Sequence, residues 1–495
     1  MPRFNVSEDD ALGPFVIGLD VGSGGTRAAV YDATGREVGK RHHKEPHTFT
    51  TAADGTSTID ADLVVDELRT SIAAVLAEPL PGPVAGIGVD TFASSLVAVD
   101  AAGKALTPCI TYADTRCRDQ VAALREAVDA EALHQQVGAR LHSSYTAPRI
   151  AWLRETQPEV FAKATQYMAL GEYAAFRLLG TPVLGTASAA WAGLLDRRTG
   201  EYATGLLEAA GADPATLSAP RDPNQGQPVA GTVLAKEFPQ LEGATWLPVI
   251  GDGLAANMGI GALGTGTWGI STATSGAIRQ LVETDIETLP SGLWAYRVDA
   301  RRTLVGSAMS DCGRVLDWAR FQLGLPEDVA EIDTERIFSA PVSEGTPIVV
   351  PFFSGERGTK WRDSSKALFA NVSASTTAED LLRGALEGVA LSYLRIADQM
   401  RELGGEPERI VLSGGMTEAI PSWLHLLADA LGSPIEHVAV SRSTMRGAAL
   451  MAIEETVPGA QVAEAPVLRK VEPVAEHADY YRARLERFEA LADLA

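Results

Sequence analysis

The chain has 495 residues, of which 46% are hydrophobic and 21% are charged, a composition typical of a globular protein. Since this length exceeds what one hydrophobic core usually serves, we expect two domains. The net charge of −22 argues against nucleic acid and anionic membrane surfaces as partners, because an acidic protein repels both. A polyphosphate ligand would need backbone amides, a metal ion or a few basic side chains to offset that field.

The cysteines and the first residues bear on the cellular compartment. The three cysteines, Cys109, Cys117 and Cys312, are odd in number and lack metal-ligand spacing, which predicts reduced thiols and a cytoplasmic protein. Residues 1–14 are polar and contain no apolar signal core, so we expect a short disordered tail there. No apolar run reaches about 18 residues, so we expect no membrane-spanning segment and no membrane partner.

The stretch FVIGLDVGSGGTRAAVYD, residues 15–32, has two apolar runs joined by a glycine-rich turn, which predicts a β-hairpin. The first run ends on Asp20, whose carboxylate suits a divalent cation. A turn with few side chains leaves its amides free to approach an anion, which favours a nucleotide site holding phosphate and magnesium. The alternative is an ordinary hairpin whose glycines only form the turn. The turn consists of Gly22, Ser23, Gly24, Gly25 and Thr26.

The rest of the first half alternates helical and extended patterns. Hydrophobic spacing predicts helices at residues 60–80, 114–128, 130–138, 149–154 and 158–179. Apolar runs predict strands at residues 84–90, 96–99 and 107–111, and α/β proteins place binding groups where strands end. The polar candidates for holding a small polyol in these loops are Ser94, Tyr112, Asp114, Arg116, His142 and Arg149. A residue of this kind in such a loop is more often an ordinary surface residue than a ligand-binding one.

A sugar acid would need a cation for its carboxylate in addition to donors and acceptors for its hydroxyls. Arg149 or Arg116 could supply that charge.

Asp252 lies between two glycines, after a short strand at residues 249–250 and before a helix expected at residues 254–261. A carboxylate in this position is accessible near a crevice between domains. In phosphoryl transfer to an alcohol, such a group can take the proton of the attacking hydroxyl. The alternative is an N-cap aspartate that only stabilises the helix, and the spacing does not separate the two.

Residues 267–281, TWGISTATSGAIRQL, repeat the strand–turn–strand pattern about 250 residues after the first hairpin. Two such hairpins predict two similar domains that each give one turn to a shared nucleotide. The second turn consists of Thr274, Ser275 and Gly276. Its alternative is a plain β-turn.

The remaining second half continues as strands and helices. A strand at residues 409–413 ends in Gly414, Gly415 and Met416, where the exposed backbone could form a shelf for an adenine ring or a simple strand-to-helix turn. The amphipathic residues 476–494 are expected to pack back onto the body. Helices are also predicted at residues 312–323, 378–403, 421–431 and 443–455.

Taken together and in order, several motifs resemble those of the FGGY carbohydrate kinases across residues 15–455. They are DVGSGGTRAAVYD, GIGVDTFASSLVAVD, TYADTR, LHSSYTAPRIAWLRE, GEYAAFRLLG, VIGDGLAANMGIGA, TATSGAIR, ALEGVALSYL, VLSGGMTEAIPSWLHLLADALGSPI and RGAALMA. The resemblance implies an α/β protein with two actin-like (ribonuclease H-like) domains that close on ATP–Mg²⁺ and a sugar or polyol. It implies an N-terminal sugar-binding domain (15–260), a C-terminal nucleotide-binding domain (261–455) and a helical extension (456–495) packing on the body.

By matching position, the resemblance implies that Asp252 is the general base and that Asp20 holds magnesium. It also implies that the turns at Gly22–Thr26 and Thr274–Gly276 flank the phosphates and that Gly414 and Gly415 face adenosine. These roles belong to the family's motifs and do not follow from spacing alone.

Within the family, TYADTR, the LHSSY loop and the Gly-Asp-Gly pattern look most like gluconate kinases, so we expect ATP-dependent phosphorylation of gluconate. The alternatives are a kinase for xylulose or another ketose or polyol and, from another class, a non-catalytic ATP or sugar sensor or an actin-like ATPase. Phe92-Ala93-Ser94 stands where related kinases commonly carry Gln-Met-His, and Arg149 stands where a lysine is common. Because of these departures, the sequence does not determine which acceptor is used. It also leaves the oligomeric state open, with a homodimer as one candidate.

Overall fold

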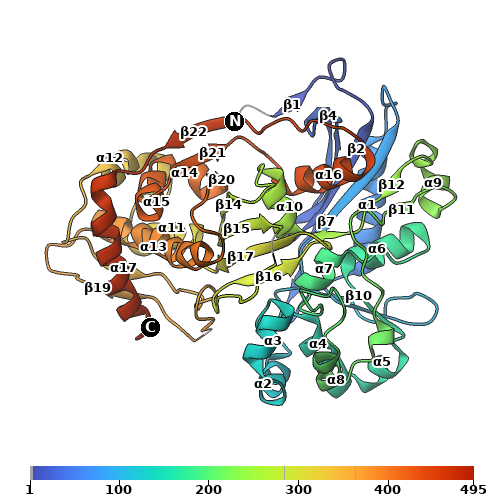
Figure 1. Ribbon diagram of the computed structural model, residues 1–495, viewed down its shortest axis with the longest axis horizontal. Helices are drawn as coiled ribbons and strands as arrows, with labels where there is room; N and C mark the ends of the chain where they lie inside the picture. Colours follow the sequence, from blue (N-terminus) through green and yellow to red (C-terminus); the bar gives the residue numbers. More distant parts are fainter. Residues whose placement is uncertain (1–3, 284, 363) are drawn as a thin grey trace.

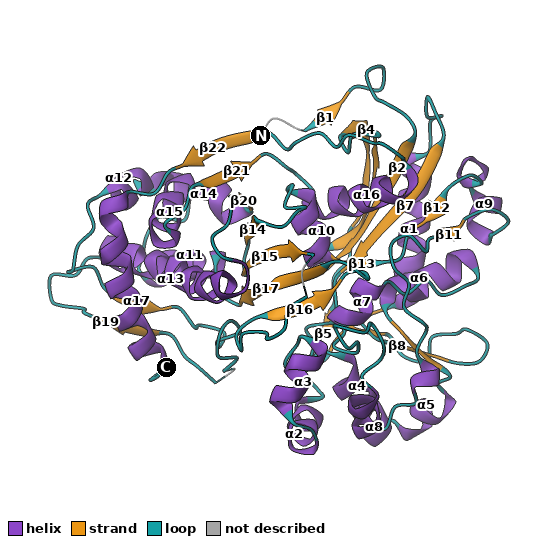
Figure 2. Ribbon diagram, in the orientation of Figure 1, coloured by secondary structure: helices purple, strands orange, loops and turns teal. Residues whose placement is uncertain are grey.

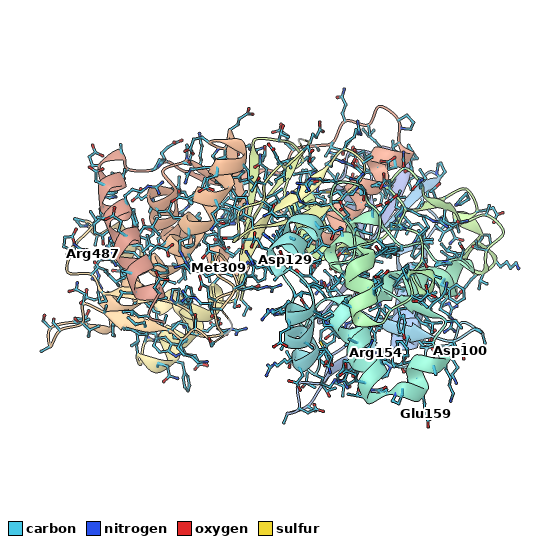
Figure 3. All side chains as sticks on the ribbon, turned by 60° about the horizontal axis from the view of Figure 1, so that its bottom comes forward. Asp100, Asp129, Arg154, Glu159, Met309 and Arg487 are labelled. Atoms are coloured by element: carbon cyan, nitrogen blue, oxygen red, sulfur yellow. The ribbon has the colours of Figure 1, made fainter. Side chains whose placement is uncertain are left out.

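The computed structural model describes residues 4–283, 285–362 and 364–495 and contains two α/β bodies, each built on its own sheet (Figures 1 and 2). With the side chains drawn, Arg154 and Glu159 lie on the first body and Arg487 on the second (Figure 3). The fold class expected from the sequence is confirmed. In the part of the chain that the structure describes, no helix is both long and apolar enough to cross a membrane.

The first sheet is organised around β2 (Phe15–Gly22), which pairs antiparallel with β3 (Gly25–Tyr31) and parallel with β7 (Val84–Thr91). β2 is buried along nearly its whole length, as is typical of a strand covered on both faces. Alternate residues contact different layers: Ile17 and Leu19 pack with α1 (Ala61–Val75), whereas Val16 packs with α16 (Ser443–Thr456).

The second sheet repeats this arrangement. β14 (Thr267–Thr272) pairs antiparallel with β15 (Gly276–Val282) and parallel with β20 (Arg409–Ser413), as β2 does with β3 and β7. Its core is closed by α13 (Ala378–Gly404) and α15 (Leu424–Leu431). The internal repeat of two hairpins predicted from the sequence is therefore present in the structure.

Helices α16 and α10 (Asp252–Gly259) pack backbone against backbone where the two bodies meet. A Cβ on Gly447 would overlap the carbonyl oxygen of Ala255, and one on Gly259 would overlap that of Ser443. A Cβ on Gly88 of β7 would likewise overlap the carbonyl of Ala448. Helix α16 lies in the sequence between β21 and β22 of the second sheet, yet it packs on the first sheet and joins the bodies (Figure 1).

The disordered tail expected at residues 1–14 is wrong for residues 4–14; residues 1–3 lie outside the described part. β1 (Asn5–Val6) pairs parallel with β4 (Glu37–Glu45), and the guanidinium of Arg446 lies 5.0 Å from the ring centroid of Phe4. This segment is ordered because the edge of the first sheet provides backbone partners, which composition does not reveal.

The C-terminal extension is not wholly helical, because β22 (Val467–Val471) extends the second sheet beside β21 (Ile435–Val438). α17 (Ala478–Ala492) then packs on α13.

The prediction of a single helix at residues 158–179 is also wrong. This segment is split into α5 (Pro158–Lys163), β10 (Gln166–Met168) and α6 (Leu170–Leu179), because β10 pairs with β8 (Val97–Val99).

The remaining elements complete the two sheets and their surroundings. The other strands are β5 (Thr50–Thr51), β6 (Ser57–Ile59), β9 (Cys109–Ile110), β11 (Gln227–Pro228), β12 (Thr245–Trp246), β13 (Ile250–Gly251), β16 (Trp294–Arg297), β17 (Thr303–Met309), β18 (Ile348–Val350) and β19 (Leu368–Ala370). The other α-helices are α2 (Arg118–Ala127), α3 (Ala130–Val137), α4 (Thr146–Thr156), α7 (Thr186–Trp191), α8 (Thr204–Ala210), α9 (Val233–Glu237), α11 (Gly313–Gln322), α12 (Thr334–Ser339) and α14 (Gly415–Ala419).

We predict that Gly447→Ala lowers the free energy of unfolding by about 3 kcal/mol, because the added methyl group would overlap the backbone of α10. The matched control is Gly205→Ala in α8, where an added Cβ has open space and the change should stay within about 1 kcal/mol. Denaturant unfolding of both variants measures the difference. Equal stability of the two would contradict close packing at Gly447.

Candidate active site

A cavity of about 270 Å³ lies where the two bodies meet. The first body lines it with Ala93, Ser94 and Tyr112, and α10 contributes Asp252. The second body contributes residues of its hairpin and of nearby loops. Those from the hairpin are Ser271, Ser275, Gly276, Ala277 and Arg279.

Asp252 is the first residue of α10, and Gly251 occupies the capping position, so the N-cap alternative does not hold. Its carboxylate lines the cavity. Burial raises the pKa of Asp252; the charge of Arg279 opposes this rise and that of Asp20 adds to it. A carboxylate with a raised pKa, open to a cavity, is suited to accept a proton.

Asp20 and Asp90 lie side by side at the ends of β2 and β7, which pair in register at these two residues. Asp20 is 2% exposed and accepts hydrogen bonds from Arg27 Nη1 at 2.7 Å and Thr444 Oγ1 at 2.9 Å. Asp90 is fully buried, and its carboxylate lies within hydrogen-bonding reach of that of Asp20. Burial, then the charges of Asp20 and Asp252, raise the pKa of Asp90.

Asp90 is not among the residues that the sequence patterns single out. Its signal is an acid that ends the apolar run Val84–Val89, paired across the sheet with Asp20. That pairing becomes visible only once the two strands are placed next to each other.

The donor set at Asp20 and Asp90 fits a hard divalent cation. Mg²⁺ is commonly held by one or two carboxylates, with water and phosphate oxygens completing its shell. Within residues 4–283, 285–362 and 364–495 no group of three or more His, Cys, Asp or Glu side chains has the geometry of a metal site. A cation at this position would therefore depend on water and nucleotide for its other ligands.

The first glycine turn is held in place by the residues beneath it. Gly25 has φ 143°, and a Cβ there would lie 2.5 Å from the carbonyl oxygen of Glu45, so only glycine fits. The hydroxyl of Thr26 is buried and donates to Glu67, so this side chain supports the turn from below. Ser23 hydrogen-bonds with Tyr112, which joins the turn to the lining of the cavity.

The second turn is fixed by the start of α11. The amides of Cys312, Gly313 and Arg314 donate to carbonyls of Ala273 and Thr274 at 2.8–3.2 Å. Thr274 and Ser275 are exposed, and Ser275 and Gly276 line the cavity.

The strand-end glycines after β20 differ from one another in their surroundings. Gly414 has φ 143°, and a Cβ would overlap the carbonyl of Thr272, so the close approach of two strands requires glycine. Gly415 is exposed, and a Cβ there would meet open space. The side chain of Met416 is buried, with its sulfur 3.6 Å from Cys312 Sγ, so only its backbone could face a ligand. The adenine shelf stays a prediction.

Of the residues predicted to hold the acceptor, Ser94 and Tyr112 line the cavity. Ser94 adopts a left-handed conformation with φ 59°, and its hydroxyl donates to the carbonyl of Trp191 at 3.0 Å. His142 Nδ1 contacts Ser144 Oγ at 2.8 Å, and Ser144 in turn lines the cavity. His142 therefore does not line the cavity itself but contacts a residue that does.

Arg149 and Arg116, predicted to supply a cation to the acceptor, do not line the cavity. Arg149 is 1% exposed, and its guanidinium donates to backbone carbonyls of Ser94, Thr111 and Ser143. It therefore fixes the loops that carry the lining residues.

Arg116 and Asp114 are occupied with each other. Arg116 pairs with Asp114 at 2.8 Å and stacks over Trp152, while Asp114 also accepts from the amide of Ser57. Neither side chain lines the cavity. The ion pair therefore stabilises the conformation of the loop.

Three aromatic residues that the sequence patterns do not single out form one wall of the cavity. Trp191 stacks on Tyr296 with ring centroids 4.4 Å apart, and Trp294 stacks on Tyr296 at 4.7 Å. They come from α7 and β16, about 100 residues apart, so no local motif unites them.

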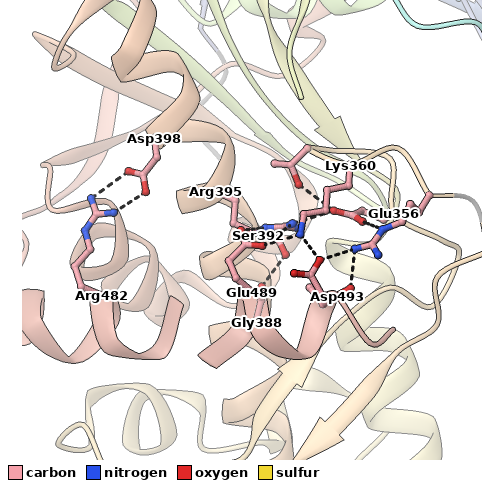
Figure 4. A network of polar contacts seen from close by, with 12 residues as sticks. Glu356, Lys360, Gly388, Ser392, Arg395, Asp398, Arg482, Glu489 and Asp493 are labelled. Carbon is pink, nitrogen blue, oxygen red and sulfur yellow. Dashed lines mark hydrogen bonds and ion pairs between the residues drawn. The ribbon is translucent and has the colours of Figure 1, made fainter. Parts of the chain in front are cut away.

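Arg279 and Arg357 also line the cavity. The loop that carries Arg357 is anchored by its neighbour Glu356, which is buried and pairs with Arg395 of α13 at 3.0 Å. Arg395 also pairs with Glu489 of α17 at 2.6 Å (Figure 4). The C-terminal helix thus helps to fix a loop at the cavity.

The two α/β bodies with their repeated hairpins have the actin-like (ribonuclease H-like) fold. The profile of the FGGY family of carbohydrate kinases, N-terminal domain, matches residues 15–259, and that of the C-terminal domain matches residues 262–454. The chain therefore belongs to the FGGY family of carbohydrate kinases, which are phosphotransferases with an alcohol group as acceptor.

Individual relatives agree with this assignment. The gluconokinase of Bacillus subtilis is 23% identical over 461 residues, covering 89% of this chain and 88% of that protein. A xylulose kinase of Streptomyces coelicolor is 28% identical, covering 89% and 88%. Among solved structures, gluconate kinase from Lactobacillus acidophilus superposes with a TM-score of 0.88 at 22% identity, covering 97% of this chain and 98% of that one.

We predict that Arg149→Met lowers the free energy of unfolding by about 3 kcal/mol, because three backbone carbonyls in the interior lose their donor. Arg118→Gln, at an exposed position of α2, is the control and should change stability by less than about 0.5 kcal/mol. Chemical denaturation measures both. Unchanged stability of Arg149→Met would contradict a structural role.

Proposed function

We propose that this protein is an ATP- and Mg²⁺-dependent kinase that transfers the γ-phosphoryl group to a hydroxyl of a sugar acid, with gluconate as the preferred acceptor. The observation that carries the proposal is the position of Asp252. Its carboxylate, with a raised pKa, opens into a cavity lined by the second glycine turn and by Tyr112, which bonds to the first turn.

The reaction follows from the chemistry of these groups. An acceptor hydroxyl attacks the γ-phosphorus, Asp252 takes its proton, the bond from phosphorus to the β–γ bridging oxygen breaks, and ADP leaves. Asp20 and Asp90 would hold Mg²⁺, which when bound neutralises charge on the phosphates. The exposed turns at Ser23–Gly24 and Thr274–Ser275 would offer backbone amides to the phosphates. These amides would offset the repulsion that a protein with net charge −22 exerts on a polyphosphate.

The preference for gluconate is supported by the gluconokinases among the relatives and by two arginines at the cavity. A kinase for xylulose remains the second candidate, since xylulose kinases of similar identity match the chain. We further propose that the protein acts in the cytoplasm; a homodimer stays a prediction from the sequence.

A coupled assay of ADP release tests the function with gluconate, other aldonic acids, pentuloses and polyols. We expect turnover with gluconate and little ADP release without an acceptor. Turnover with a ketose and none with gluconate would contradict the acceptor. ATP hydrolysis that is independent of every acceptor would contradict the kinase.

We predict that Asp252→Asn lowers kcat about 1000-fold, because the amide cannot take the hydroxyl proton, while nucleotide binding changes little. Asp119→Asn on the exposed face of α2 is the control. In the wild type, kcat/KM should fall as the pH decreases through the pKa of Asp252, which lies above its usual value of 3.8. Full activity of Asp252→Asn would contradict its assignment as the base.

We predict that Asp90→Asn raises the Mg²⁺ concentration for half-maximal activity about tenfold, because one of two carboxylates at the proposed cation position is lost. Without Mg²⁺ the variant should unfold at a higher temperature than the wild type, because a buried carboxylate beside Asp20 has become neutral. Kinetic titration with Mg²⁺ and thermal unfolding with EDTA measure the two effects. An unchanged Mg²⁺ requirement would contradict this role.

A further inference from the structure

The guanidinium groups of Arg279 and Arg357 line one cavity, where the nearby carboxylate is Asp252. Arg279 Nη1 donates to Ser271 Oγ at 3.2 Å. Its Nε is buried and, among the described residues, has no hydrogen-bond partner. Burial lowers the pKa of Arg279, Asp252 raises it and Arg357 lowers it. A buried donor without a partner beside a second cation indicates that an anionic ligand completes this part of the site.

The surrounding backbone leaves room for the Arg279 side chain. Its cross-strand partners in β14 and β17 are both glycines, Gly269 and Gly306. Across the cavity, a Cβ on Gly253 would overlap the Trp191 indole and lie 3.4 Å from Arg279 Nε. The second glycine of the Gly-Asp-Gly motif thus allows both side chains to approach Asp252.

The position of Arg279 favours the acceptor over the nucleotide as the source of the anion. Arg279 lies three residues beyond Gly276 along β15, roughly 10 Å from the second turn at the usual rise of a strand. It lies close to Tyr296 of the aromatic wall, and both side chains line the cavity. Arg149 and Arg116, two arginines of the first body that the sequence singles out, are already paired with other groups of the protein.

We propose that Arg279, assisted by Arg357, binds the carboxylate of the acceptor and determines the preference of this enzyme for sugar acids over neutral polyols. The inference rests on the proposed function and names the residue that carries its acceptor specificity. A guanidinium offers parallel N–H groups that match a carboxylate, and the partly buried, aromatic cavity strengthens the pair. Holding one end of the carbon chain at Arg279 would bring a hydroxyl to the adjacent Asp252.

The proposal is tested by calorimetric measurement of the affinities of the full-length protein for gluconate and for MgADP. Arg279→Gln should weaken gluconate binding about 100-fold, the size expected when a charge-assisted pair is lost, and should leave MgADP binding unchanged. Arg279→Lys should recover part of the loss, and the exposed Arg118→Gln should bind both as the wild type does. Kinetics should show the same loss in kcat/KM for gluconate and a clearly smaller loss for glucitol or another neutral acceptor that the wild type uses.

The outcomes separate the inference from the proposed function. If the wild type phosphorylates gluconate and Arg279→Gln binds it as tightly as the wild type, or loses gluconate and MgADP equally, the role of Arg279 is refuted while the function stands. If the wild type neither binds nor phosphorylates any sugar acid, the proposed acceptor class is refuted.

Discussion

The contact of α16 with α10 and β7, backbone against backbone at Gly447, Gly259 and Gly88, is the constraint on which the site depends. α10 begins with Asp252, and the first turn of α16 contains Thr444, which donates to Asp20. Because glycines remove the side chains between these elements, Asp252, Asp20 and Asp90 come close enough to influence one another's ionisation. The close approach of these three aspartates is thus a consequence of how the helices pack.

The two bodies contribute different chemistry to one cavity. The first supplies the carboxylate of Asp252 and the polar loops, whereas the second supplies the arginines and part of the aromatic wall. Although the chain has a net charge of −22, two arginines, Arg279 and Arg357, line this cavity. The ion pairs that join Glu356, Arg395 and Glu489 extend this organisation to the C-terminal helix, which fixes the loop of Arg357.

Local sequence patterns were sufficient where function is built from a continuous stretch of chain. Both hairpins and the position of Asp252 at a helix start follow from apolar runs broken by glycine. Patterns could not assign Arg149, because the three carbonyls that occupy it come from separate loops. Arg279 reads as an ordinary strand residue until Gly253 and Trp191 are placed opposite it.

The ordered N-terminal segment and the split at residues 158–179 escaped prediction for the same reason, since each depends on pairing with a distant strand.

The proposed phosphorylation of gluconate is tested most directly by mass spectrometry of the products formed from ATP and gluconate. We expect one phosphorylated gluconate for each ADP released. ADP and inorganic phosphate with unmodified gluconate would contradict it.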